Sequence, residues 1–190
     1  MKTYKQLFEA IIDLENLFSA WDRFKQGKRS KRDVQKFERY LEQNIFELQR
    51  ELQQKTYKHE AYTSFFIQDP KQRHIHKASV RDRVVHHAVF RIINPIFEPT
   101  FISYSFSCRV DKGTHKGVAA MEKMIRQVSR NYSRKCFVLE CDIRSFFESI
   151  DHDVLLTILR KKVRDEDVLW LLEDIIRSHY SKRLSVFSLK

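Results

Sequence analysis

The chain has 190 residues, of which 42% are hydrophobic and 13% aromatic, which allows a packed core and excludes a disordered tail. Lysine and arginine number 36 against 25 acidic residues, a formal charge of +11, which favours nucleic acid as partner, then an anionic membrane surface, with solubility alone as the alternative. The three cysteines lack paired spacing, which argues against a disulfide framework and a zinc site. No apolar run approaches the length of a bilayer span, so no membrane-spanning segment is predicted, and of the two polyanions nucleic acid is the expected partner and a membrane is not.

The first 54 residues predict two amphipathic helices. Apolar residues recur every three or four positions over residues 4–25, which predicts the first helix. An N-cap at Ser30 with Asp33 in the first turn predicts a second helix that ends near Gln54. Residues 25–36 form a basic connection that either contacts phosphates or is a solvated loop. The two helices are expected to form a helical hairpin.

A β-hairpin is predicted next. Residues 62–68 are rich in aromatic and β-branched side chains, residues 69–72 have the composition of a turn, and residues 73–78 supply the returning strand. Lys71 and Arg73 lie at and after the tip. Cations there could close on a triphosphate, and ordinary surface charge is the alternative.

A further helix is predicted from Ser79, because Asp82 three residues later completes a capping pattern. Apolar residues then continue until Pro95, which is expected to end the helix. Arg81 and Arg83 lie in its first turns and are candidates for contact with a nucleic-acid template.

Residues 104–110 alternate apolar and polar side chains, which predicts a strand or an extended segment, and residues 114–132 predict a helix. Arg109, Lys112 and Lys116 cluster where the two meet. An extended backbone flanked by cations suits a template or an incoming nucleotide.

The stretch FVLECDIRSFFESI contains the strongest candidate for chemistry. Residues 137–143 alternate as in a strand, and Asp142 falls at its end. A buried strand tolerates a carboxylate only when a metal, a cation or water compensates the charge. With Phe147 five positions later, this pattern indicates a nucleotidyl-transfer site with Mg²⁺, which prefers carboxylate oxygens. The alternative is an Asp that meets solvent or caps a turn.

Two last helices are predicted after N-caps at Asp151 and Asp165. Asp153 is better explained by the favourable position of an acid in a first helical turn than as part of a second carboxylate pair. Residues 178–190 form a basic tail without a clear pattern.

Four segments then follow one another in a specific order: PKQRHIHKASVRDRVVHHAV, NPIFEPTF, SYSFSCRVDKGTHKGV and ECDIRSFFESIDHDVL. In this order they resemble the first blocks of bacterial retroelement reverse transcriptases. The resemblance is closest to the enzymes of diversity-generating retroelements, then to those of group II introns. It covers the chain up to about Ser178 and corresponds to the N-terminal half of such an enzyme.

The resemblance implies an α+β fold, namely right-hand polymerase fingers plus an incomplete palm, with an N-terminal helical hairpin. Residues 1–30 would be a helical extension, 31–112 the fingers, and 113–190 a partial palm that ends before the second catalytic block. The implied activity is RNA-directed DNA polymerisation. The implied partners are an RNA template, a DNA or RNA primer, deoxynucleoside triphosphates and a basic accessory protein, in the cytoplasm of a bacterium, with the gene bacterial or phage-encoded.

Roles for individual residues also follow from the resemblance. Asp142 would be the first carboxylate of a two-magnesium site, with the backbone carbonyl of Ile143 beside it. Phe147 would be a steric gate against the ribose 2′-hydroxyl. Lys71 and Arg73 would meet the triphosphate. Arg109 and the Lys112 turn match a block near template and nucleotide.

The family's second metal block, an aromatic residue followed after one position by two aspartates, is absent, and no Asp-Asp pair occurs in the chain. We therefore expect this polypeptide alone not to polymerise. A non-catalytic RNA-binding module that retains the polymerase fold is the alternative function.

Overall fold

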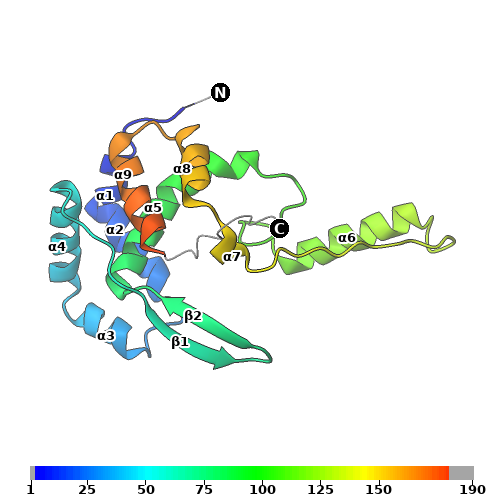
Figure 1. The fold of residues 1–190 in the computed structure, drawn as a ribbon, viewed down its shortest axis with the longest axis horizontal. Coiled ribbons are helices and arrows are strands. Elements are labelled where there is room, and N and C mark those ends of the chain that lie inside the picture. The colour runs from blue at the N-terminus through cyan, green and yellow to red at the C-terminus, as the bar shows by residue number, and fades with distance from the viewer. Residues whose placement is uncertain (1–2, 180–190) are drawn as a thin grey trace, which may run out of the picture. The chain divides into compact units, whose positions relative to one another are not determined.

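The computed structural model describes residues 3–179 of the chain. In this part the helices are accompanied by one two-stranded antiparallel sheet, so the predicted α+β class is confirmed (Figure 1). Residues 3–94 and 145–179 make up a first compact unit, and residues 95–144 make up a second. The division into helical extension, fingers and partial palm stays a prediction.

The first unit begins with α1 (Phe8–Ile12), α2 (Leu14–Lys25), α3 (Arg32–Arg39) and α4 (Leu41–Gln53). The predicted helical hairpin is confirmed, because α2 packs against α4 and the rings of Phe18 and Phe46 meet edge to face at 6.3 Å. Each predicted helix is broken in two. Asp13 separates α1 from α2, because its side chain accepts a hydrogen bond from the Glu15 backbone N–H at 3.1 Å. Tyr40 separates α3 from α4.

The predicted N-cap at Ser30 is wrong. The helix begins one residue later than expected, and its N-cap residue is Lys31, which makes no side-chain cap. The Lys31 backbone N–H donates to the Lys28 carbonyl at 3.0 Å, so Ser30 lies inside the turn that follows α2. Its hydroxyl is therefore too early in the chain to reach the first N–H groups of α3.

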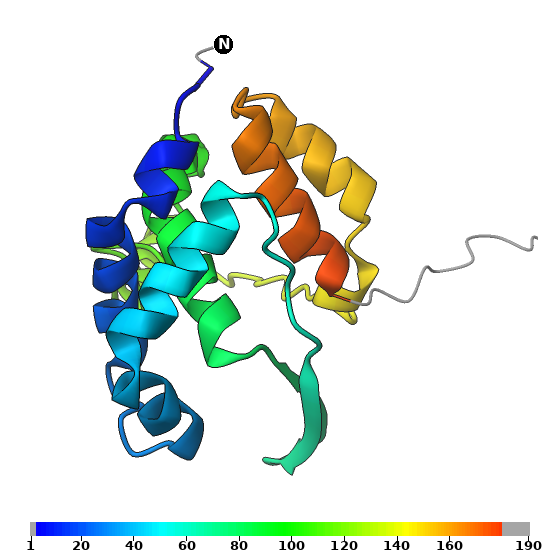
Figure 2. The same ribbon diagram turned by 90° about the vertical axis from the view of Figure 1, so that its left-hand side faces the viewer.

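The predicted β-hairpin is confirmed. Strand β1 (Thr63–Gln68) pairs antiparallel with β2 (Gln72–Lys77), and the register joins Phe66 to His74 and Gln68 to Gln72. The strands project from the helices of the first unit (Figures 1 and 2). Aromatic and β-branched residues favour this extended backbone, and the polar residues of the turn reverse it.

Helix α5 (Val80–Phe97) starts as predicted, because Ser79 and Asp82 form a reciprocal cap. It does not end at Pro95, however, and a short 3₁₀ turn, η1 (Glu98–Thr100), follows it. A proline removes its own N–H from the helix. Because Pro95 lies only two residues before the end of α5, its missing N–H removes a single helical hydrogen bond. The helix can therefore continue to Phe97.

Two further helices, α8 (His152–Arg160) and α9 (Glu166–Ser178), follow the short α7 (Phe146–Ser149). Both predicted caps are confirmed. The carboxylate of Asp151 accepts bonds from the Asp153 and Val154 N–H groups, and that of Asp165 caps α9 in the same way. Asp165 also accepts bonds from the Leu7 and Phe8 N–H groups and so joins α9 to α1.

The core of the first unit is formed by the inward faces of its helices, with the largest contributions from α2, α4, α5 and α9. Its buried apolar residues include Leu17, Ala20, Trp21 and Phe24 of α2, Ile45, Leu48 and Leu52 of α4, Val84, Val85 and Ala88 of α5, and Val168, Leu169, Leu171 and Leu172 of α9. Apolar side chains at helical spacing face one side of each helix, so their burial stabilises the packing. None of the helices in residues 3–179 combines the length and apolar character that crossing a membrane requires.

The second unit contains α6 (Thr114–Val128), and the two strands predicted around it are not formed. Residues 104–110 contain turns, and Cys108 within them and Asp111 just after them have positive φ angles of 55° and 57°. Residues 137–143 have no partner strand in the described part of the chain, and Phe137 is 92% exposed. Alternation of side chains favours an extended backbone, but a strand also needs a neighbour for its N–H and C=O groups. The predicted basic tail lies almost entirely outside the described residues.

Candidate nucleic-acid interface

Two cations lie at the free end of the β-hairpin. Lys71 is in the turn, which the Asp69 backbone N–H closes by donating to the Lys71 carbonyl at 3.3 Å, and Arg73 follows in β2 opposite Ile67. Both side chains are exposed, and neither has an ion-pair partner among residues 3–179. Because their charges are uncompensated there, they are suited to binding phosphate oxygens.

An ion-pair cluster around Asp33 anchors the base of the hairpin. Lys77 of β2 and Arg83 of α5 approach the Asp33 carboxylate at 2.7 and 2.9 Å. Burial alone would raise the pKa of Asp33, but hydrogen bonds and charge from Lys77 and Arg83 hold the pKa below its usual value. The guanidinium of Arg83 also lies 4.7 Å from the centre of the Phe24 ring. The cluster therefore connects α3, the hairpin and α5.

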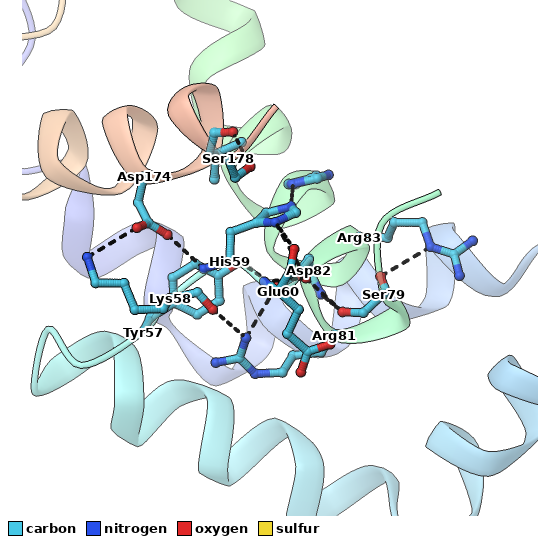
Figure 3. Close-up of polar contacts among 12 residues, drawn as sticks. Tyr57, Lys58, His59, Glu60, Ser79, Arg81, Asp82, Arg83, Asp174 and Ser178 are labelled. Atoms are coloured by element: carbon cyan, nitrogen blue, oxygen red, sulfur yellow. Dashed lines mark hydrogen bonds and ion pairs between the residues drawn. The ribbon is translucent and has the colours of Figure 1, made fainter. Parts of the chain in front are cut away.

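The buried carboxylate of Asp82 joins the start of α5 to the loop that follows α4. It accepts hydrogen bonds from the Tyr57 hydroxyl at 2.7 Å, the Ser79 hydroxyl at 2.8 Å and the Glu60 backbone N–H at 3.1 Å (Figure 3). Burial is the largest cause that raises the pKa of Tyr57. The negative charge of Asp82 and its hydrogen bond with the Tyr57 hydroxyl raise this pKa further. Since the loop leads into β1 and Ser79 follows β2, Asp82 holds both ends of the hairpin.

Arg81 is part of the same arrangement. It forms ion pairs with Asp82, at 3.2 Å, and with Glu51 of α4, and its guanidinium lies 4.5 Å from the centre of the Tyr57 ring. Burial is the largest influence on Arg81 and lowers its pKa, although Asp82 acts in the opposite direction. The charges of Arg81 and Arg83 are thus compensated inside the first unit, and their contact with a template stays a prediction.

Two histidines meet beside this cluster. The Nε2 atoms of His59 and His86 are 3.2 Å apart, and their rings stack at 5.2 Å. In such a pair one Nε2 donates a hydrogen bond and the other accepts it. Burial, followed by the proximity of His59, lowers the pKa of His86 to about 4. The backbone N–H of His59 also donates to Asp174 of α9 at 2.8 Å.

In the second unit, Arg109 and Lys112 hold a loop. Arg109 pairs with Glu98 at 2.7 Å and donates to the carbonyl of Ser105 at 2.9 Å. Lys112 donates to the carbonyl of Ser103 at 2.9 Å. Lys116 is exposed in the first turn of α6. The roles of these three cations in binding a template stay predictions.

Asp142 is exposed in the second unit, and its Oδ1 accepts a hydrogen bond from the Ile143 backbone N–H at 3.0 Å. Phe147 is 75% exposed and its ring meets that of Phe146 edge to face at 5.3 Å.

Residues 3–179 contain no group of three or more His, Cys, Asp or Glu residues that could hold a metal ion. Asp142 therefore has the chemistry of a magnesium ligand, but the described residues do not form a magnesium site by themselves.

The predicted site residues fall into two sets. Lys71, Arg73, Arg81, Arg83 and Phe147 belong to the first unit, and Arg109, Lys112, Lys116, Asp142 and Ile143 belong to the second. The sequence analysis missed the buried network of Asp82 and the pairing of Phe66 with His74. The capping pattern from Ser79 indicated the first in part, and the register of the predicted hairpin could have indicated the second.

Comparison with known proteins reveals relatives over about half of the chain, although no protein-family model matches it. The chain is 30% identical over 97 residues to nuclear intron maturase 1 of Arabidopsis thaliana, a mitochondrial protein, covering 51% of this chain and 13% of the relative. It is 25% identical over 100 residues to protein YkfC of Escherichia coli, covering 53% and 26%.

The group II intron-encoded protein LtrA of Lactococcus lactis is 24% identical over 110 residues, covering 58% of this chain and 17% of the relative. The matched region is thus a small part of each of these longer proteins. These similarities confirm the predicted resemblance to reverse transcriptase-like proteins of retroelements, and the closer resemblance to the enzymes of diversity-generating retroelements stays a prediction.

Proposed function

We propose that this chain forms the nucleotide- and template-binding portion of an RNA-directed DNA polymerase. The observation that carries the proposal is its similarity to an intron maturase and to a group II intron-encoded protein. The surplus of 11 positive charges and the two uncompensated cations of the hairpin support it, because an RNA template and a triphosphate are both polyanions.

In this proposal the hairpin binds the triphosphate. Lys71 and Arg73 neutralise its charge, and the arginine offers a planar pair of donors that matches phosphate oxygens. Arg109, Lys112 and Lys116 contact the template backbone, and Phe147 excludes a ribose 2′-hydroxyl by its size. The ion-pair cluster of Asp33 and the buried network of Asp82 act indirectly, because they fix the direction in which the hairpin leaves the helices.

Asp142 is proposed as one ligand of Mg²⁺, with the Ile143 carbonyl as a second oxygen donor. The bound ion would supply Lewis-acid stabilisation of charge on the phosphates. The remaining ligands would come from the substrate and from groups outside residues 3–179. We therefore expect the purified chain alone not to extend a primer on an RNA template. Robust synthesis by this chain would contradict that expectation.

RNA binding at increasing salt concentration tests the proposal. Fluorescence anisotropy with a labelled single-stranded RNA should show affinity that falls steeply with salt, because bound cations displace counterions from the RNA. Lys116→Ala, which removes an exposed cation assigned to the template, should lower the magnitude of the slope by about 0.7, the value for one lost phosphate contact on a single strand.

Arg177→Ala is the matched control, because Glu173 and Asp153 already compensate that charge. It should leave the slope nearly unchanged. A flat salt response of the unaltered chain would contradict the proposed function.

A non-catalytic RNA-binding module is the second candidate. It is favoured by the observation that residues 3–179 contain no group of three or more His, Cys, Asp or Glu residues that could hold a metal ion. Such a module would bind RNA with the same salt dependence but would not bind deoxynucleoside triphosphates. Nucleotide binding at the hairpin therefore distinguishes the two functions.

A further inference from the structure

The register of the β-hairpin separates its side chains into two faces of different chemistry. Residues that pair directly across two strands point to the same face. One face, here called the ring face, carries the pairs Ser64 with His76, Phe66 with His74, and Gln68 with Gln72. The opposite face carries the pairs Thr63 with Lys77, Phe65 with Ile75, and Ile67 with Arg73.

The rings on the ring face stack on one another. The ring centres of Phe66 and His74 are 4.4 Å apart and their planes differ by only 14°. The ring of His74 is in turn 4.3 Å from that of His76. Phe66 is nevertheless 64% exposed, and both histidines are exposed as well. A run of stacked rings is therefore open to solvent.

Ring contacts within the first unit hold the inner end of this run. His76 meets His179, which follows α9, at 5.9 Å, and His179 meets Tyr62 at 5.7 Å. Tyr62 stacks on the buried side chain of His59 at 4.9 Å. These contacts anchor the hairpin at its base and leave the outer pair, Phe66 and His74, with an open stacking surface.

The composition of the ring face points to nucleobases. A protein partner or the acyl chains of a membrane would favour a continuous apolar surface. Here the rings are flanked by Ser64, Gln68 and Gln72, whose side chains can form hydrogen bonds with base edges. Lys71 lies in the turn at the same end of the hairpin, where its positive charge complements a phosphate group, whereas Arg73 lies on the opposite face.

We propose that the ring face binds single-stranded RNA by stacking unpaired bases on Phe66 and His74. This inference rests on the proposed function and adds to it a contact between one face of the hairpin and the RNA template in single-stranded form. Bases in a duplex are stacked on one another and present only their edges, whereas unpaired bases can stack on protein rings. The ring face therefore discriminates single-stranded RNA from duplex RNA.

The chain offers a matched pair of variants for the test. Phe65 and Phe66 are adjacent, and both are exposed, at 43% and 64%, but they lie on opposite faces. Phe66→Ala should weaken binding of single-stranded RNA by on the order of tenfold, the usual loss for one stacked base. Phe65→Ala should weaken it less than about twofold. Neither variant should change the affinity for a duplex of the same length.

Two further variants separate stacking from apolar contact and from misfolding. Phe66→Trp should retain the affinity, whereas Phe66→Leu should lose it, and circular dichroism of all variants should match the unaltered chain. A single-stranded RNA that contains 2-aminopurine should change its fluorescence on binding in proportion to the stacking that remains. This result would support the proposal.

Equal losses of single-stranded RNA affinity in Phe65→Ala and Phe66→Ala would overturn the stacking proposal and leave the proposed function intact. Full affinity in Phe66→Leu would have the same consequence. A loss of duplex binding equal to the loss of single-strand binding would overturn the stacking proposal as well. Absence of any RNA binding by the unaltered chain would overturn both the stacking proposal and the proposed function.

Discussion

Replacing Asp82 by alanine removes the acceptor on which the base of the hairpin depends. The carboxylate is fully buried and accepts bonds from Tyr57, Glu60 and Ser79 within 3.1 Å, while Arg81 approaches it at 3.2 Å. Breaking a buried ion pair by removing one partner costs about 3–5 kcal/mol. Because Glu51 still compensates Arg81 in part, we expect a loss of about 4 kcal/mol in the free energy of unfolding.

Urea denaturation followed by tryptophan fluorescence measures this loss. Both tryptophans of the chain, Trp21 and Trp170, lie in the first unit, and Trp21 is 1% exposed. Tyr57→Phe deletes only one of the donors and should cost about 1–2 kcal/mol. Asp22→Ala removes an exposed carboxylate that pairs with Lys25 and should cost less than about 1 kcal/mol.

The order of the three losses in unfolding free energy tests whether the Asp82 carboxylate stabilises the base of the hairpin. An Asp82→Ala variant that is no less stable than Asp22→Ala would refute the reasoning, because the donors would then find other partners at no cost. A loss equal to that of Tyr57→Phe would show that the tyrosine hydroxyl alone carries the network.

Three further predictions concern other parts of the chain. Because burial lowers the pKa of His86 to about 4 from 6.5, the unfolded chain binds more protons between these values, and stability should fall as the pH drops through that window. His86→Gln should remove this slope in urea titrations, and an unchanged slope would contradict the assignment. Burial would raise the pKa of Asp165, but four backbone N–H groups together hold it below 3.8. Its contribution to stability should therefore be complete above pH 4 and disappear as the pH falls below that value, and Asp165→Asn should be less stable than the unaltered chain at neutral pH but lose less stability on acidification. Gly113, before α6, has φ 95° and ψ 176°, a conformation essentially restricted to glycine, so Gly113→Ala should destabilise the start of α6 by about 1–3 kcal/mol. Hydrogen exchange of the α6 amides measures that effect, and unchanged protection would count against it.

Local signals in the sequence predicted much of the secondary structure. The caps at Asp151 and Asp165 and the reciprocal pattern of Ser79 with Asp82 depend on residues within one helical turn, so they could be identified without a fold. The β-hairpin was predicted for the same reason, because its turn and its two strands are adjacent in the chain.

Features that depend on distant residues could not be predicted in this way. The alternation over residues 137–143 indicated a strand, but pairing requires a neighbour, and the described chain supplies none. The network of Asp82 draws on Tyr57 and Glu60, more than 20 residues earlier. For the candidate site, the sequence identified cations and carboxylates by type. Only the folded chain distinguishes Arg81, whose charge is compensated, from Arg73, which has no ion-pair partner within the described residues 3–179.

The most direct test of the account is photocrosslinking of a labelled deoxynucleoside triphosphate to the purified chain in the presence of an RNA template and a primer. The account predicts crosslinks within the hairpin, at or next to Lys71 and Arg73, that are competed by unlabelled nucleotide and lost in the Lys71→Ala, Arg73→Ala double variant. Crosslinks that persist in this variant, or a chain that binds RNA but crosslinks no nucleotide, would contradict the claim that the hairpin is the triphosphate-binding part of a polymerase.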